Sequence, residues 1–125
     1  GNPDIDELLV IDTKKWRRNI NLKTFSEARA FVRKMREKRF DIAIDLQGLV
    51  KSGVIARLSG AKKIIGFDKA NLRESANALF TNTKVGPGPG RHHVVDICLS
   101  LLKPLNLKRV EHSFFFICPL WMNLL

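Results

Sequence analysis

Apolar residues along this chain fall into short uninterrupted runs separated by stretches with helical spacing. The three clearest runs lie within residues 7–12, 40–46 and 62–67. A run of this length without polar alternation is typical of a parallel strand that is covered on both faces. We therefore predict strands over these three ranges and a shorter strand over 83–85.

The apolar spacing between these runs predicts helices. Residues 24–39 form the clearest one, with Thr24 and Glu27 as a capping box. Its apolar stripe consists of Phe25, Ala28, Phe31, Val32 and Met35. Further helices are predicted over residues 49–59, 71–80 and 92–102, with Gly60 as a left-handed cap and Pro104 as a stop.

Strands and helices thus alternate along the chain, which predicts an α/β fold with a parallel sheet and helices on its faces. Residues 111–125 depart from this pattern and form an atypical apolar tail. The first strand follows a Pro turn without a preceding Met. This start leads us to expect that the chain begins within a domain, and the tail leads us to expect a truncation or an altered reading frame near the end.

The charge is the unusual feature of the composition. Lys and Arg number 22 against 12 Asp and Glu, a net charge of +10, which favours an anionic partner. The two cysteines, Cys98 and Cys118, are not spaced for a metal site and suit a reducing cytoplasm. We identify no signal peptide, membrane span or metal site in the sequence.

Four polar clusters follow the predicted strands or the Gly/Pro loop at 86–90. In parallel strands, the carboxyl ends share one edge of the sheet, which is where ligands of such folds bind. The clusters are Lys14-Lys15-Trp16-Arg17-Arg18, then Asp45, Gln47, Gly48 and Lys51, then Asp68, Arg73 and Glu74, and finally His92, His93 and Asp96.

The chemistry of these clusters is anion binding. Arg17, Arg18 and Arg73 can each hold a phosphate or carboxylate in bidentate fashion. Trp16 can stack on a sugar, or it can be buried beside the first strand. His93 can donate to a ligand, or it can hold a local partner at a helix start.

Two acidic residues also have structural alternatives. Glu74 can pair with Arg73, and Asp45 can cap its own turn instead of acting as an acid or base. No nucleophile elbow, phosphate-binding loop or dinucleotide fingerprint is present, and no residue stands out as a general base.

Several runs in this order resemble the lipopolysaccharide heptosyltransferases of glycosyltransferase family 9. They are Asp45-Leu46-Gln47-Gly48-Leu49-Val50-Lys51-Ser52, Ile65-Gly66-Phe67-Asp68, Leu72-Arg73-Glu74 and His93-Val94-Val95-Asp96, together with the basic-Trp-basic cluster at 14–18. The resemblance implies a Rossmann-like parallel sheet with flanking helices, the incomplete amino-terminal half of a GT-B fold. Residues 1–110 would be a partial acceptor-binding domain.

The resemblance also implies a function, the inverting transfer of heptose from ADP-heptose to the lipopolysaccharide inner core without a required metal or cofactor. Acceptor binding would carry over to Lys14, Lys15, Trp16, Arg17, Arg18, Gln47, Lys51, Arg73 and His93. The family's catalytic base and its ADP-sugar domain match nothing in this chain, so we expect no catalytic residue here and no activity from the chain alone. Ile97 and residues 112–125 depart from the family's pattern.

The expected partners are an anionic lipopolysaccharide-core acceptor and, in the full-length enzyme only, the ADP-heptose donor. The expected location is the cytoplasm, with peripheral contact at the inner membrane left open. A small basic nucleic-acid-binding module and a phosphosugar-binding α/β module of another family are the alternatives. Nucleic acid is disfavoured because few aromatic residues other than Trp16 lie among the basic residues. In addition, no nucleic-acid fold signature appears.

Overall fold

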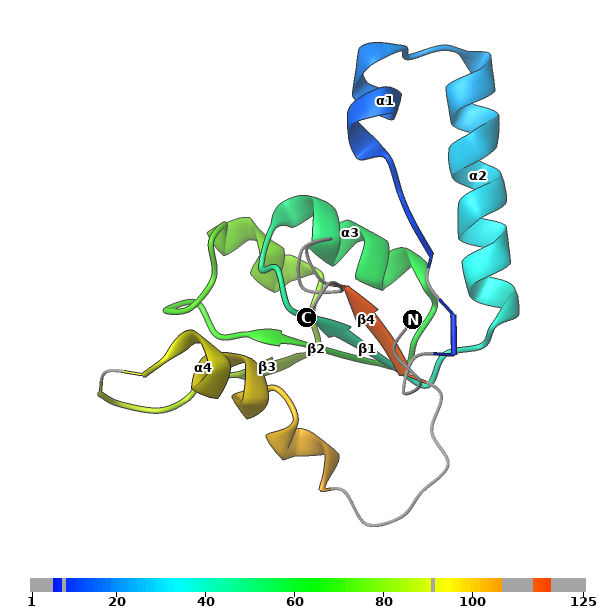
Figure 1. Cartoon of the computed structure of the whole chain (residues 1–125). Helices are drawn as coiled ribbons and strands as arrows, with labels where there is room; N and C mark the ends of the chain where they lie inside the picture. Colours follow the sequence, from blue (N-terminus) through cyan, green and yellow to red (C-terminus); the bar gives the residue numbers. More distant parts are fainter. Residues whose placement is uncertain (1–5, 8, 91, 107–113, 118–125) are drawn as a thin grey trace. The chain divides into compact units, whose positions relative to one another are not determined.

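The structure is a computed structural model that describes residues 6–7, 9–90, 92–106 and 114–117 (Figure 1). The chain divides into two compact units, residues 1–33 and residues 34–125. We call them the first unit and the second unit and describe each by itself.

The second unit is built on a parallel sheet of four strands in the order β3-β2-β1-β4. The strands are β1 (Ile42–Asp45), β2 (Lys63–Phe67), β3 (Thr83–Val85) and β4 (Phe114–Ile117). Ile44 lies opposite Ile65 on one side and Phe116 on the other. From β1 the chain adds β2 and then β3 on one side, whereas β4 pairs with β1 on the other side. The strand order therefore changes direction between β1 and β4, which makes this position a topological switch point.

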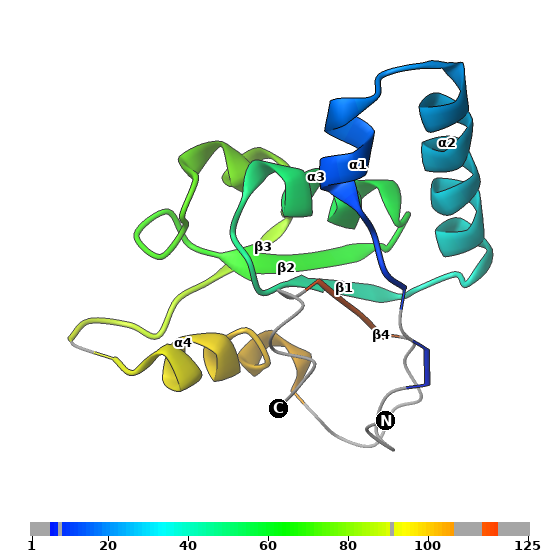
Figure 2. The same ribbon diagram turned by 45° about the horizontal axis from the view of Figure 1, so that its top comes forward.

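Helices cover both faces of this sheet. The connections contain α3 (Val50–Leu58), the 3-10 helix η1 (Ser75–Leu79), α4 (Val94–Ser100) and the 3-10 helix η2 (Lys103–Leu105). Figure 2 shows α3 on one face of the sheet and α4 on the other. This arrangement explains why the predicted strands carry uninterrupted apolar runs.

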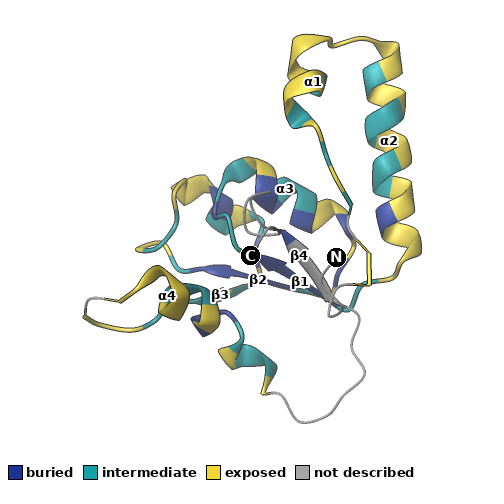
Figure 3. Cartoon of the chain, viewed as in Figure 1, coloured by how far each residue is buried: buried dark blue, intermediate teal, exposed yellow. Residues whose placement is uncertain are grey.

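The core accordingly has two layers. Ile42 and Ile44 pack on the α4 side with Leu101, whereas Ala43 packs on the other side with Ala56 of α3. Successive residues of β1 thus alternate between two covered faces, and all four of them are buried. Figure 3 shows the buried residues gathered in the sheet and along α3.

The first unit consists of α1 (Thr13–Arg18) and most of α2 (Leu22–Glu37). The two helices contact each other through Trp16 and Phe31, whose ring centroids lie 6.2 Å apart at an interplanar angle of 70°. An ion pair of 3.9 Å between Lys15 Nζ and Glu27 Oε2 adds a second contact. None of the described residues in the first unit is fully buried.

The strand predicted over residues 7–12 is not present among the described residues. Among residues 7 and 9–12 none is in a strand, and Val10 is 64% exposed. These residues pair with no strand among the described residues. Because β structure depends on such pairing, an apolar run alone does not form a strand.

The helix at 24–39 is confirmed, but its cap is not Thr24. Asn21 Oδ1 accepts from the Thr24 backbone N at 2.9 Å, so the helix begins earlier. Phe25, predicted for the buried stripe, is exposed.

The remaining strands and the helices at 49–59 and 92–102 are confirmed with small shifts, as are the strand at 83–85 and the left-handed Gly60 with φ +77°. The helix predicted over 71–80 is only in part correct, because residues 75–79 form the 3-10 helix η1 and residues 71–74 are not helical. Strand β4 was not predicted, since residues 111–125 were assigned to an apolar tail. Residues 114–117 instead pair with β1, and Leu46 N donates to Ile117 O at 2.9 Å. Residues 111–113 and 118–125 of that predicted tail lie outside the described residues.

Candidate functional site at the carboxyl edge of the sheet

Strand β1 ends in a buried carboxylate that organises the turn into α3. Asp45 is 0% exposed. Its Oδ1 accepts from the backbone N of Gln47 at 2.9 Å and of Gly48 at 3.2 Å. Its Oδ2 accepts from Ser52 Oγ at 2.9 Å and from Asn77 Nδ2 at 2.7 Å. With all its partners inside the fold, Asp45 matches the turn-capping interpretation and not that of an acid or base.

A second carboxylate, from outside α3, accepts a hydrogen bond at the start of that helix. Glu74 Oε2 accepts from the backbone N of Val50, and the Glu74 backbone N donates to Gly48 O at 3.1 Å. Arg73 and Glu74 are both described and form no ion pair with each other, so the alternative of an Arg73–Glu74 pair is not supported. Glu74 therefore serves the helix start, and the neighbouring Arg73 side chain is exposed.

Gly48 gives this turn a left-handed backbone, with φ of +67°, which side-chain-bearing residues rarely adopt. A Cβ there would lie 3.4 Å from Leu72 Cδ2 and 3.5 Å from Arg73 N, which are ordinary contact distances. The backbone conformation therefore favours glycine here, and the segment after β2 lies in contact with the turn. The fold thus brings the half-buried Gln47 and the exposed Lys51 to the same edge as Arg73.

The network beneath this edge includes residues that sequence reasoning missed. Asn77 of η1 donates from Nδ2 both to Asp45 and to Leu49 O, the latter at 2.6 Å, while Asn77 Oδ1 is buried without a partner in the described residues. Ser52 Oγ accepts from Leu49 N at 3.1 Å. No local pattern marks Asn77, because its partners lie far away in the sequence. Ser52 was visible only as part of the run that carries the family resemblance.

His93 stands at the start of α4. Its Nδ1 accepts from Val95 N at 3.3 Å, and the imidazole is exposed. This is the local helix-start role that the sequence left as an alternative. The ring can still meet a ligand through Nε2, so the binding role of His93 stays a prediction.

The basic-Trp-basic cluster lies in the first unit and is itself the helix α1. Asp12 Oδ1 caps it by accepting from Lys15 N at 3.0 Å. Because none of the described residues before the cluster, 6–7 and 9–12, is in a strand, the reason for placing it at the sheet edge is wrong. Trp16 is half-buried, and its ring contacts Phe31 of α2 within the same unit. The four basic residues of the cluster are exposed, namely Lys14, Lys15, Arg17 and Arg18.

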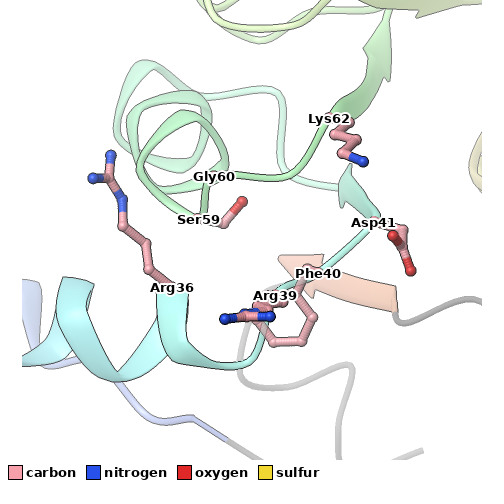
Figure 4. Close-up of a pocket in the computed structure, with 7 residues that line it drawn as sticks. All are labelled: Arg36, Arg39, Phe40, Asp41, Ser59, Gly60 and Lys62. Atoms are coloured by element: carbon pink, nitrogen blue, oxygen red, sulfur yellow. The ribbon is translucent and has the colours of Figure 1, made fainter.

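A cavity of about 530 Å³ opens near the amino ends of β1 and β2 (Figure 4). It is lined by Arg36, Arg39, Phe40, Asp41, Ser59, Gly60 and Lys62, none of them a predicted acceptor-binding residue. Arg36 Nε donates to Leu58 O at 2.9 Å, which caps the carboxyl end of α3. That contact gives Arg36 a structural role at the helix end.

The described residues contain no group of three His, Cys, Asp or Glu side chains that could hold a metal ion. Among the same residues, no helix has the length and apolar character to cross a membrane. Cys98 is half-buried, and this burial raises the pKa of its thiol above the ordinary value. Cys118 lies outside the described residues.

Comparisons with known proteins agree with this architecture. The profile of glycosyltransferase family 9 (heptosyltransferase) matches residues 28–114. A lipopolysaccharide heptosyltransferase 1 of Pseudomonas aeruginosa is 28% identical over 95 residues, which cover 74% of this chain and 26% of that protein. Another of Campylobacter coli is 33% identical over 85 residues, covering 68% of this chain and 22% of that protein.

Solved structures show the same likeness. The E. coli heptosyltransferase WaaC with ADP superposes with a TM-score of 0.66 at 28% identity, over 81% of this chain and 32% of that one. WaaC with ADP-2-deoxy-2-fluoro heptose gives a TM-score of 0.67 over 82% of this chain and 33% of that one.

The parallel sheet, its flanking helices and these superpositions define part of a Rossmann-like half of a GT-B glycosyltransferase, as predicted. The chain belongs to glycosyltransferase family 9, the heptosyltransferase family. It spans about a quarter of the length of the curated relatives it matches.

Proposed function

We propose that this chain is part of the acceptor-binding half of a heptosyltransferase. The enzyme would transfer heptose from ADP-heptose to the lipopolysaccharide inner core, with inversion at the sugar carbon, on the cytoplasmic side of the inner membrane. Family membership and relatives named lipopolysaccharide heptosyltransferase 1 support the reaction class. The anionic acceptor agrees with the net charge of +10.

The observation that carries the acceptor assignment is that exposed cations lie beside a turn that is held by hydrogen bonds. Lys51 and Arg73 are exposed, and both sit next to the hydrogen-bonded turn that Asp45 closes. A turn fixed before binding lowers the entropy lost when a ligand is ordered. Gln47 supplies an amide at the same place. Lys14, Lys15, Trp16, Arg17, Arg18 and His93 are proposed as the other acceptor contacts.

The chain covers only about a quarter of the length of its relatives, so we propose that it supplies acceptor binding and that other parts of the enzyme supply the remaining functions. The base and the ADP-sugar site are proposed to lie outside this chain, as the family resemblance implies. Transfer needs donor, acceptor and base held together, and losing that alignment removes a large part of the rate enhancement. We therefore expect the isolated chain to bind acceptor without turning over ADP-heptose.

Acceptor binding is tested with a lipid-free, phosphorylated inner-core oligosaccharide and titration calorimetry. Arg73→Gln and Lys51→Gln are each expected to weaken binding by about three- to tenfold, because each removes an exposed charge-assisted contact. The control is Lys62→Gln, which removes an exposed cation from the cavity near the amino ends of the strands and should leave affinity unchanged.

Two outcomes would sink the assignment. One is equal weakening by Lys62→Gln and Arg73→Gln, which would mean that charge alone attracts the ligand. The other is tighter binding to duplex DNA than to the oligosaccharide, with a steep salt dependence, which would favour the nucleic-acid alternative. Heptose transfer by the chain alone would contradict the expected division of labour only.

A further inference from the structure

The turn between α1 and α2 presents large apolar side chains to solvent. Ile20 is 89% exposed, Leu22 90% and Phe25 70%. These three side chains fall within six consecutive residues, 20–25, and we call them the apolar tip. Leu22 and Phe25 are three residues apart on α2 and therefore neighbours on its surface. Clustered exposure of this kind marks an interaction site more often than scattered single residues do.

The turn beneath the apolar tip is held by its own hydrogen bonds. Asn21 Oδ1 accepts from Thr24 N at 2.9 Å, Asn21 O accepts from Phe25 N at 3.1 Å, and the Thr24 hydroxyl donates to Asn19 O. The Trp16–Phe31 contact and the Lys15–Glu27 pair join the two helices behind it. Figures 1 and 2 both show the turn at one end of the α1–α2 hairpin. A fixed backbone thus keeps the three side chains outward.

Basic residues flank the apolar tip in the sequence, and one of them, Lys15, pairs with Glu27. Residues 13–26 contain no Asp or Glu and five basic residues, Lys14, Lys15, Arg17, Arg18 and Lys23. Arg29 continues the exposed stripe of Leu22 and Phe25, since it lies four residues after Phe25 on the same helix. An apolar tip flanked by exposed basic residues complements one surface in particular, the headgroup layer of an anionic bilayer.

We propose that the apolar tip inserts into the interface of an anionic lipid bilayer while the surrounding cations contact lipid phosphates. Aliphatic and aromatic side chains enter the boundary between headgroups and acyl chains, and the basic residues gain from the negative surface potential. Nucleic acid fits less well, because it offers no apolar layer for Ile20 and Leu22. This inference goes beyond the acceptor assignment and needs no sugar at the site.

The test is flotation of the full chain with vesicles of phosphatidylcholine and phosphatidylglycerol, and with vesicles of phosphatidylcholine alone. The chain is expected to float with the anionic vesicles and to dissociate as salt rises. The triple variant Ile20→Gln, Leu22→Gln, Phe25→Gln is expected to lose about tenfold or more in vesicle affinity. Leu79→Gln with Leu99→Gln, which also removes exposed leucines, is the matched control and should bind as the parent does.

The outcomes separate this inference from the acceptor assignment. The triple variant should still bind the lipid-free oligosaccharide, and Arg73→Gln should still float. Unchanged flotation of the triple variant overturns the proposal, as does equal binding to neutral vesicles. Sedimentation of the parent as a dimer that the triple variant cannot form, without vesicle binding, would assign the apolar tip to a second copy of the chain and would also overturn it.

Discussion

The carboxylate of Asp45 is buried, yet none of its hydrogen-bond partners is a cation. Two backbone N–H groups, a serine hydroxyl and an asparagine amide take that place. A buried charge is tolerated when donors satisfy its lone pairs, and these four donors come from the turn, α3 and η1. One side chain therefore ties together the elements that position Gln47, Lys51 and Arg73.

Replacing this carboxylate by an amide tests that role. Asp45→Asn sets a donor against the donors that now face Oδ2. If the Asn77 amide turned over to offer its unpartnered Oδ1, it would lose its bond to Leu49 O. We expect the free energy of unfolding to fall by roughly 2–4 kcal/mol, measured by urea denaturation.

The control for this change is Glu37→Gln, which also exchanges a carboxylate for an amide but at an exposed position of α2. It should shift the free energy of unfolding by less than about 0.5 kcal/mol. Similar stabilities for Asp45→Asn and the parent would mean that the buried network does not hold the turn.

At the scale of elements, sequence patterns predicted β1, β2 and the edge strand β3, but they placed a strand within residues 7–12 and missed β4. The runs at 40–46 and 62–67 became β1 and β2 because both faces of these strands are covered. The run within 7–12 was just as apolar, but a strand also needs a neighbour, and local pattern does not supply one. Strand β4 was missed for the converse reason. Residues 114–117 lack an amphipathic period and were assigned to the tail, although they pair with β1.

The candidate site was predictable to a similar extent. The grouping of Gln47, Lys51 and Arg73 followed from the rule that parallel strands share their carboxyl edge. The partners of Asp45 in η1 did not, since Asn77 lies 32 residues away from it in the sequence. The cap of α2 shows a local limit, because Asn21 and Thr24 are both good cap residues and only the backbone decides between them.

The packing of α3 against η1 gives a prediction at this scale. A Cβ on Gly53 would lie 2.8 Å from Asn77 Nδ2 and 3.0 Å from Phe80 Cβ. Gly53→Ala should raise helix propensity by about 1 kcal/mol, but overpacking against η1 should outweigh it and lower the free energy of unfolding by about 1–2 kcal/mol net. Urea denaturation measures the balance.

Gly88→Ala provides the comparison for Gly53→Ala. A Cβ at Gly88 has nothing within 4 Å, and φ is +89°, so only backbone strain acts there. That change should cost about 1 kcal/mol. A stabilised Gly53→Ala variant would show that α3 and η1 are not closely packed.

At the scale of the whole molecule, burial separates the two units. Every fully buried apolar residue in the described part of the chain lies between Met35 and Ile117, in the second unit. In the described residues of the first unit, the Trp16–Phe31 ring contact and the Lys15–Glu27 ion pair join the two helices, and local caps hold their ends. Its exposed cations and apolar tip suit a surface that meets ligands more than one that stabilises the fold.

This difference predicts unequal protection against hydrogen exchange. A six-residue helix such as α1 is marginal without packing, and elements with little buried area open locally at a lower free energy than the core. Backbone amides of α1 should therefore exchange on the order of tenfold or more faster than those of β1 and β2, after correction for intrinsic rates. Exchange followed by mass spectrometry on the chain at neutral pH measures both sets at once. If α1 and β2 showed equal protection, the two units would open as one, and the weak contacts of the first unit would have to be stronger than their burial indicates.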